Sequence, residues 1–210
     1  KLFDKITDMI SESQGAPFLL NFDERSIAGM LREARISKIE NYINLNNVFD
    51  YAPVGCLENT MVGNDRSGTV DCNLNLAKAI ELVLANGREF FEVIDPIKKR
   101  KEKSKQIGPN TGDPTKFKDF DQFFSAYEIQ TKFIIKKIVE LYDKGELVRA
   151  KYHPTPYLSC LIKGCIEKGI DITQGGAEIN FVTLEAVTFA TTVDSLLAIK
   201  YLVFEKKYVT

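Results

Sequence analysis

Apolar residues recur at helical spacing in several stretches of the chain, and this spacing predicts most of the helices. The stretches with this pattern are residues 2–12, 24–38, 73–86, 119–143, 157–168 and 192–204. Asp119 and Thr192 stand where a side chain can cap the first backbone N–H groups of a helix. Asn86-Gly87 and Lys144-Gly145 are typical helix ends. We therefore expect a helix-rich chain.

The remaining apolar segments are shorter and are bounded by turn residues. Residues 48–54 predict a strand that ends at Gly55, and residues 177–182 predict a second strand after Gly175-Gly176. Residues 59–69 and 95–118 are rich in polar residues, glycine and proline, which predicts loops. The pattern as a whole is that of a mixed α/β protein.

Composition narrows the class of protein. The 210 residues are 44% hydrophobic and 27% charged, enough to bury a sizeable core. A net charge of −1 excludes whole-chain attraction to nucleic acid or anionic membrane. No apolar run approaches the roughly 20 residues of a membrane span. Because no signal peptide opens the chain, we expect a cytoplasmic protein. The first residues already predict a helix, which suggests a piece of a longer protein.

One segment departs from this balance, the basic run at residues 98–105. No aromatic residue separates its charges, as base stacking would require. It therefore predicts a solvated surface loop. The alternative that stays open is that the chain is a non-catalytic helical interaction module and uses this loop to bind its partner.

The cysteines exclude the common metal and disulfide frameworks. They form no CxxC pair, and the single histidine, His153, completes no zinc-ligand set, so we expect no metal in this chain. His153-Pro154 has the character of a turn. The four cysteines are Cys56, Cys72, Cys160 and Cys165. We expect all except Cys56 to be unremarkable reduced thiols.

Gly55-Cys56-Leu57-Glu58 is the segment whose side chains are best suited to catalysis. In an extended backbone, a cysteine and a carboxylate two positions apart point to the same side. Gly55 permits a tight turn that would present Cys56 at a loop tip. The sulfur could then act on a C–H bond while Glu58 handles a proton. A lone cysteine is more often a small buried hydrophobe, so the residues alone leave both interpretations open.

The same four residues resemble the GCxE motif of glycyl radical enzymes, the pyruvate formate-lyase superfamily. Four further blocks resemble family segments in the expected order. They are Gly15–Asp23, Pro154–Ser159, Gly175–Phe181 and Asp194–Lys200, and Asp50–Val54 resembles the run that leads to the cysteine. The resemblance implies that the chain is the helix-rich C-terminal part of a ten-stranded α/β barrel and carries the cysteine loop. Residues 1–210 would form one pyruvate formate-lyase-like domain.

The resemblance also implies a mechanism. A glycyl radical, installed by a radical S-adenosylmethionine activating enzyme, passes to Cys56, and the thiyl radical then takes hydrogen from the substrate. Glu58 would be the acid/base group. The family's RVxGY-like glycine motif does not occur in this sequence, so the fragment alone is expected to be inactive. The intact protein would be a homodimer, with a small iron–sulfur subunit as a further candidate partner.

Two residues are similar to the arylacetate decarboxylase branch, typified by 4-hydroxyphenylacetate decarboxylase. Asn59 replaces the proline that usually follows GCxE, and Glu178 stands where a glutamate of that branch lies near the polar end of the ring. The resemblance thus implies a carboxy-lyase with Glu178 in substrate binding. No histidine lies between Glu58 and His153, so indoleacetate and phenylacetate join the candidate substrates. The alternative is a glycyl radical dehydratase or C–N/C–S lyase of a small alcohol.

A thiyl radical must be kept from oxygen and stray hydrogen donors, which predicts a dry, enclosed cavity. We expect Glu58 and Glu178 to line this cavity together, with the pKa of each carboxyl raised by desolvation.

Overall fold

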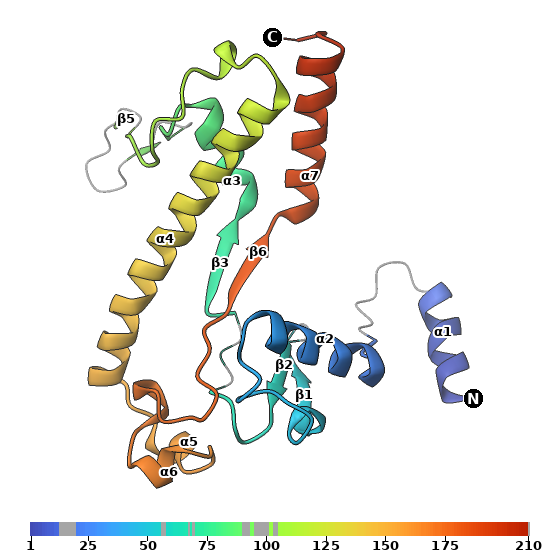
Figure 1. Ribbon diagram of the computed structural model, residues 1–210, viewed down its shortest axis with the longest axis vertical. Coiled ribbons are helices and arrows are strands. Elements are labelled where there is room, and N and C mark those ends of the chain that lie inside the picture. The colour runs from blue at the N-terminus through green and yellow to red at the C-terminus, as the bar shows by residue number, and fades with distance from the viewer. Residues whose placement is uncertain are drawn as a thin grey trace. The chain divides into compact units, whose positions relative to one another are not determined.

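The computed structural model describes residues 1–12, 20–55, 58–66, 68, 70–89, 93–94, 101–102 and 105–209 (Figure 1). The chain divides into two compact units, and each is described by itself. Unit 1 consists of residues 1–69 and 153–182, and unit 2 of residues 70–152 and 183–210. The mixed, helix-rich α/β character expected from the sequence is confirmed.

Unit 1 contains an antiparallel hairpin and several helices. Its elements are α1 (Leu2–Glu12), α2 (Asp23–Ile36), β1 (Tyr51–Val54), β2 (Glu58–Met61), α5 (Pro156–Ser159) and α6 (Cys165–Lys168). Val48–Asp50 forms a 3-10 turn directly before β1, and Ile172–Gln174 forms another after α6. A small apolar cluster holds the second half of the unit together. It consists of Ile162, Cys165, Ile172 and Ala177.

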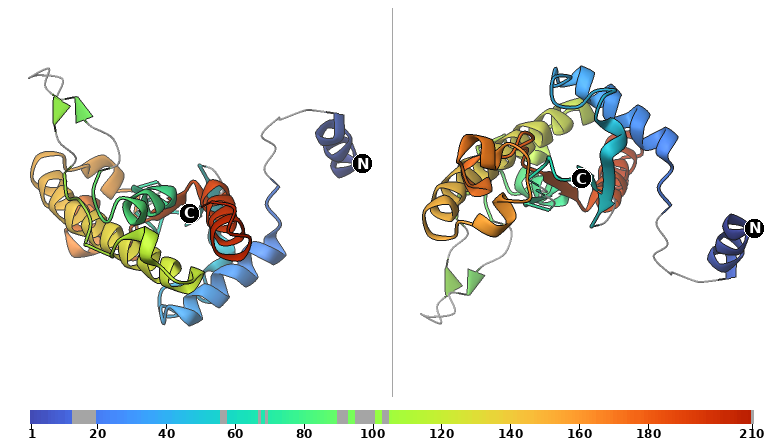
Figure 2. Two further views of the ribbon diagram at one scale, coloured as in Figure 1. Left: turned by 90° about the horizontal axis from the view of Figure 1, so that it is seen from above. Right: turned by 90° about the horizontal axis from the view of Figure 1, so that it is seen from below.

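Unit 2 is organised around the parallel pair β3 (Cys72–Asn75) and β6 (Leu184–Val187). Its remaining elements are α3 (Leu76–Leu84), β4 (Val93–Ile94), β5 (Lys101–Glu102), α4 (Phe120–Tyr152), α7 (Phe189–Ala198) and a π-helical turn at Ile199–Glu205. Figure 2 shows α3 between α4 and α7, and α3 contacts both of these helices. The core lies here. Its buried members are Ala79, Ile80, Val83, Phe123, Ala126 and Tyr127.

The long helix α4 begins where the sequence predicts and ends later. The Asp119 carboxylate accepts a hydrogen bond from the Gln122 backbone N–H at 2.9 Å, so the predicted cap is confirmed. The predicted end at Lys144-Gly145 is wrong, because α4 continues to Tyr152. Gly145 costs about 1 kcal/mol relative to alanine in a helix interior, too little to end a helix of 33 residues.

Two strands of the structure were not predicted from the sequence. Residues 73–75, predicted as the start of a helix, belong to β3, and Asn75 caps α3 by accepting from the Lys78 N–H at 3.2 Å. β6 occupies residues 184–187 rather than the predicted 177–182, where only Ile179 makes an isolated bridge. Both strands form because β3 and β6 pair with each other, although more than a hundred residues separate them in the sequence. The predicted loop at 59–69 begins as strand β2.

Helix boundaries differ in two further places. The predicted helix at 157–168 is two short helices, because Gly164 adopts φ +92° between them. Helix α7 starts at Phe189, so Thr192 is no cap. Its hydroxyl instead donates to the Thr188 carbonyl at 2.8 Å. Residues 95–100 and 103–104, which include most of the basic run, lie outside the described residues. Of the helices described, none is both long and apolar enough to cross a membrane.

Candidate active site

The β1–β2 hairpin carries the GCxE motif at its tip. Tyr51 pairs with Met61 at its base, and Val54 pairs with Glu58 at its upper end. Gly55 leaves β1 with φ +56°, the left-handed conformation that glycine adopts without strain. Cys56, the predicted thiyl residue, lies outside the described residues together with Leu57. Its role therefore stays a prediction, while its two flanks are defined.

Glu58 bends back over the hairpin tip. A Cβ atom added to Gly55 would lie 2.6 Å from Oε2 and 3.4 Å from Oε1 of the Glu58 carboxylate. The bare Cα of Gly55 thus provides the space that this carboxylate occupies. The glycine of the motif therefore serves two purposes, since it makes the turn and makes room for the acid/base residue. The Glu58 side chain is half-buried.

The segment of Glu178 is attached to the end of the same hairpin. After Met61, which is buried, the chain turns, and the Arg66 N–H donates to the Ile179 carbonyl at 3.0 Å. The Ile179 N–H donates to the Asn64 carbonyl at 3.1 Å. Glu58 and Glu178 thus belong to connected parts of unit 1, although they are 120 residues apart in the sequence.

Glu178 forms an ion pair with Lys163, whose Nζ lies 3.2 Å from Oε1. Its neighbours Ala177 and Ile179 are buried, which directs Glu178 away from the small cluster of unit 1. The carboxylate is exposed in the described part of the chain, so these residues alone do not form the enclosed cavity that we expect around it. That Glu58 and Glu178 line one cavity stays a prediction.

Lys163 is a site residue that sequence reasoning missed. Its backbone N–H donates to the Gly63 carbonyl at 2.8 Å, and its carbonyl accepts from the Glu178 N–H at 3.2 Å. It therefore joins the turn after β2 to the segment of Glu178 by backbone bonds as well as by the ion pair. Only the opposite charges of Lys163 and Glu178 could have hinted at this pairing, since no motif spans the two.

A hydrogen-bonded hub fixes the segment between α5 and Glu178. Asp171 accepts from the Ser159 hydroxyl at 2.8 Å and from the Thr173 N–H at 2.9 Å. It also accepts from the Thr155 N–H. Partial burial opposes the charge of Asp171, but these bonds outweigh it and lower the pKa of the carboxyl to about 2. Asp171 is therefore an ionised structural acceptor at neutral pH.

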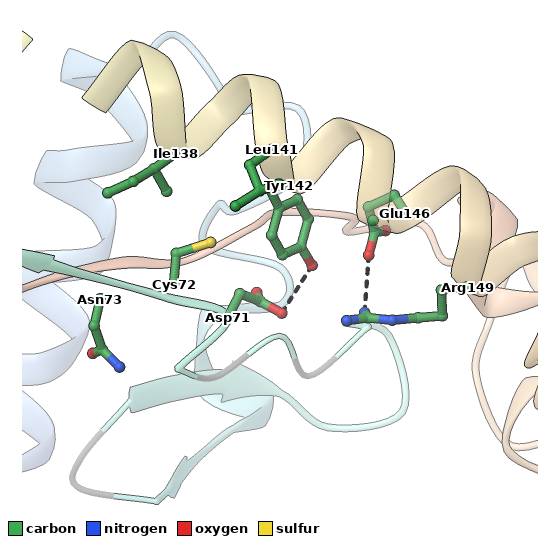
Figure 3. A pocket seen from close by; sticks show the side chains of 9 residues that line it. Asp71, Cys72, Asn73, Ile138, Leu141, Tyr142, Glu146 and Arg149 are labelled. Carbon is green, nitrogen blue, oxygen red and sulfur yellow. Dashed lines mark hydrogen bonds and ion pairs between the residues drawn. The ribbon is translucent and has the colours of Figure 1, made fainter. Parts of the chain in front are cut away.

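Unit 2 contains a hollow of about 410 Å³ between the start of β3 and the second half of α4 (Figure 3). The Tyr142 hydroxyl donates to Asp71 at 3.0 Å, and Asp71 also accepts from the Thr183 N–H at 3.0 Å. This carboxylate thereby joins α4 to the strands β3 and β6. Of the predicted site residues that the structure describes, Glu58 and Glu178 do not line this hollow.

The described cysteines behave as expected for structural thiols. Cys72, Cys160 and Cys165 are free, and Cys165 is buried. Burial and the negative charge of Asp71 raise the pKa of the Cys72 thiol, while burial and Asp171 raise that of Cys165. A raised pKa disfavours the reactive thiolate. Within the described ranges, no group of three or more histidine, cysteine, aspartate or glutamate residues could hold a metal ion.

The chain belongs to the pyruvate formate lyase-like family, which it matches over residues 1–210. Its structural neighbours are glycyl radical enzymes with an α/β barrel, and the family implies a glycyl radical.

Three relatives illustrate the likeness. The chain is 38% identical over 153 residues to trans-4-hydroxy-L-proline dehydratase of Clostridioides difficile, covering 73% of this chain and 18% of that enzyme. It is 31% identical over 207 residues to isethionate sulfite-lyase of Oleidesulfovibrio alaskensis, covering 98% and 23%. The glycerol-bound structure of the B12-independent glycerol dehydratase from Clostridium butyricum gives a TM-score of 0.70 at 29% identity, covering 90% and 23%.

These relatives are dehydratases and a sulfite-lyase, which agrees with the alternative reaction class of the sequence analysis better than with decarboxylation. The chain spans about a fifth of the length of the curated relatives that it matches.

Proposed function

We propose that the intact protein is a glycyl radical lyase that eliminates water, or another leaving group such as sulfite, from a small hydroxylated substrate. The observation that carries this proposal is the hairpin tip, where the carboxylate of Glu58 lies against the bare Cα of Gly55, the residue that precedes Cys56 in the sequence. The reaction class is supported by the relatives that dehydrate or release sulfite.

In this reaction Cys56 transfers hydrogen atoms and Glu58 transfers a proton. The glycyl radical supplies a centre that accepts a hydrogen atom from the Cys56 thiol. The Cys56 thiyl takes a hydrogen atom from the substrate carbon that carries the hydroxyl. Glu58 takes the hydroxyl proton and passes it on to the group that departs from the neighbouring carbon, so that a departing hydroxyl leaves as water and the carboxylate is regenerated. The Cys56 thiol then returns a hydrogen atom to that carbon, so the product is a carbonyl compound and the thiyl is regenerated.

Glu58 suits this proton step because its position is set by the hairpin. Val54 and Glu58 are directly paired, which fixes the backbone of Glu58 beside the tip, and the carboxylate lies in the space that the bare Cα of Gly55 leaves. A base must lie within hydrogen-bond reach of the proton that it removes, and such a group contributes typically about 10²- to 10⁴-fold to the rate. Glu58→Gln removes the proton acceptor with little change of shape. We expect turnover to fall within that range.

The test of reaction class uses the intact protein, activated anaerobically. We expect carbonyl product from at least one of glycerol, propane-1,2-diol and isethionate, with no carbon dioxide from arylacetates. Cys56→Ser should keep the glycyl radical signal in electron paramagnetic resonance and lose turnover, because a serine O–H bond is too strong to be opened. Carbon dioxide from 4-hydroxyphenylacetate, indoleacetate or phenylacetate, with no carbonyl product, would overturn the proposal.

The second candidate is an arylacetate decarboxylase, favoured by Asn59 and by the glutamate at position 178. In that case Glu178 binds the polar substituent of the ring. Glu178→Gln should then slow turnover of 4-hydroxyphenylacetate or indoleacetate by roughly 10- to 1000-fold and that of phenylacetate much less. Equal effects on the three acids would argue against this placement of Glu178.

A further inference from the structure

The side chain of Tyr51 attaches the base of the cysteine hairpin to the start of helix α2. Tyr51 is the first residue of β1, and its hydroxyl donates to Oδ1 of Asp23 at 2.6 Å. The same hydroxyl accepts from Nδ2 of Asn21 at 2.9 Å, and Oδ1 of Asn21 accepts from the Ser26 hydroxyl at 2.6 Å. The four side chains form one continuous hydrogen-bonded chain.

The chemistry of this cluster keeps the Tyr51 proton in place. The hydrogen bond to Asp23, followed by partial burial, raises the pKa of the Tyr51 hydroxyl above its ordinary value. The phenol therefore remains a donor throughout the physiological range. Asp23 is the first residue of α2, where the helix dipole favours a negative charge. A neutral donor thus faces an ionised acceptor, an arrangement that gives short and strong hydrogen bonds.

The hairpin needs such an anchor because it is short. β1 and β2 have four residues each and form a two-stranded sheet. An isolated two-stranded hairpin is marginally stable at best. At the base, Met61 is buried, and the Val62 N–H donates to the Asp50 carbonyl at 3.0 Å, which extends the pairing of the two strands by one bond. On the β1 side, the Tyr51 hydroxyl bonds to the segment that begins α2.

We propose that Tyr51 is a positioning residue for the thiyl chemistry, a role that rests on the proposed function. Through Asp23 and Asn21 it fixes the base of the hairpin, and the paired strands carry that constraint to the tip with Cys56 and Glu58. Tyr51 touches no reacting atom in this assignment. Its loss displaces the tip without changing the residues that react.

The experiment compares Tyr51→Phe and Asp23→Asn with the matched control Tyr42→Phe in the intact protein. Tyr42 also lies in unit 1, and among the described residues its hydroxyl makes no hydrogen bond, so the control removes the same atom without breaking a contact. Amide hydrogen exchange in peptides covering residues 51–62 reports the anchor without any substrate. We expect faster exchange in the two test variants and unchanged exchange in the control.

The rate arm uses activated protein, with turnover normalised to the glycyl radical content measured by electron paramagnetic resonance. We expect Tyr51→Phe to lower kcat by about 10- to 100-fold, because small misplacements of reacting groups have effects of this size. KM should change much less. The isotope effect on kcat with substrate deuterated at the reacting carbon should increase, because hydrogen transfer becomes slower. The double variant Tyr51→Phe/Asp23→Asn should be no slower than Tyr51→Phe alone, since Asp23→Asn weakens a contact that Tyr51→Phe removes altogether.

Unchanged amide hydrogen exchange in residues 51–62 would show that Tyr51 does not anchor the hairpin. Faster exchange with unchanged kcat and isotope effect would overturn the positioning role. If the wild type releases carbon dioxide from arylacetates instead of forming carbonyl products, the proposed function fails. The same variants are then measured on arylacetates, so the Tyr51 proposal is decided separately.

Discussion

The contact between Gly55 and Glu58 can be perturbed by adding a single methyl group. Gly55→Ala places a Cβ atom 2.6 Å from Oε2 of Glu58, well inside ordinary contact distance. The carboxylate is the end of a flexible side chain, so it moves aside and the hairpin still folds. We therefore expect the variant to misplace the acid/base group while it keeps every reacting residue.

The expected effect of Gly55→Ala has two parts, a loss of stability and a loss of rate, and Gly169→Ala is a control that separates them. Gly55 has φ +56°, so alanine there is strained by roughly 1–2 kcal/mol. Gly169 has φ +62° and nothing within 4 Å of an added Cβ, so Gly169→Ala has the same backbone strain without a collision. A misplacement of about 1 Å in the reacting groups can cost roughly 100-fold in rate. Only Gly55→Ala should have this second effect.

The assay measures kcat per glycyl radical in the intact, activated protein, together with the thermal unfolding midpoint of each variant. We expect similar losses of stability for the two variants, and a loss of kcat of about 100-fold for Gly55→Ala alone. The pH dependence of kcat should also change in Gly55→Ala, since Glu58 is moved to a new environment. Equal kcat values for Gly55→Ala and Gly169→Ala would refute the role of the glycine in placing Glu58.

Three further predictions concern stability. The pKa of Asp171 is about 2 in the folded state, below its ordinary value, so its stabilising contribution is present above about pH 4 and is lost as the pH falls toward 2; Asp171→Asn should flatten this decline in acid unfolding monitored by circular dichroism. Gly176→Ala would collide with the backbone carbonyl of Ile170, which cannot move aside as a side chain does, so we expect a lower urea midpoint than for Gly169→Ala. Asp119→Ala removes the cap of α4 and should cost about 1 kcal/mol in denaturant titration, whereas no loss would contradict the capping role.

Local features of the sequence predicted those parts of the fold that depend on local interactions. The apolar spacing of residues 2–12 predicts α1 at its observed bounds, and Asp119 predicts the start of α4. The strand at residues 72–75 could not be predicted in this way, because it forms only by pairing with β6, more than a hundred residues later. Local propensity has no access to a partner at that distance.

The same distinction holds for the candidate site. The spacing of the GCxE motif predicts Glu58 near the hairpin tip, and the structure adds that Gly55 provides room for its carboxylate. The link from Glu58 to the segment of Glu178 depends on backbone bonds between residues 63–66 and 163–179, which no local pattern encodes. Tyr51 was likewise hidden, because its partners Asn21 and Asp23 precede it by about thirty residues.

The parallel pairing of β3 with β6 has a consequence for the order in which the chain folds. The Asp71–Thr183 bonds close a loop of 112 residues, whereas the hairpin at Gly55 closes over a few. Each doubling of loop length costs about 0.6 kcal/mol of closure entropy, so this pairing begins at a disadvantage of roughly 3 kcal/mol. The contact of α3 with α4 can form first, while β3 can pair only after β6, more than a hundred residues later, has been synthesised. Because residues 153–182 of unit 1 separate the two parts of unit 2, neither unit is complete during synthesis before residue 182 has been added.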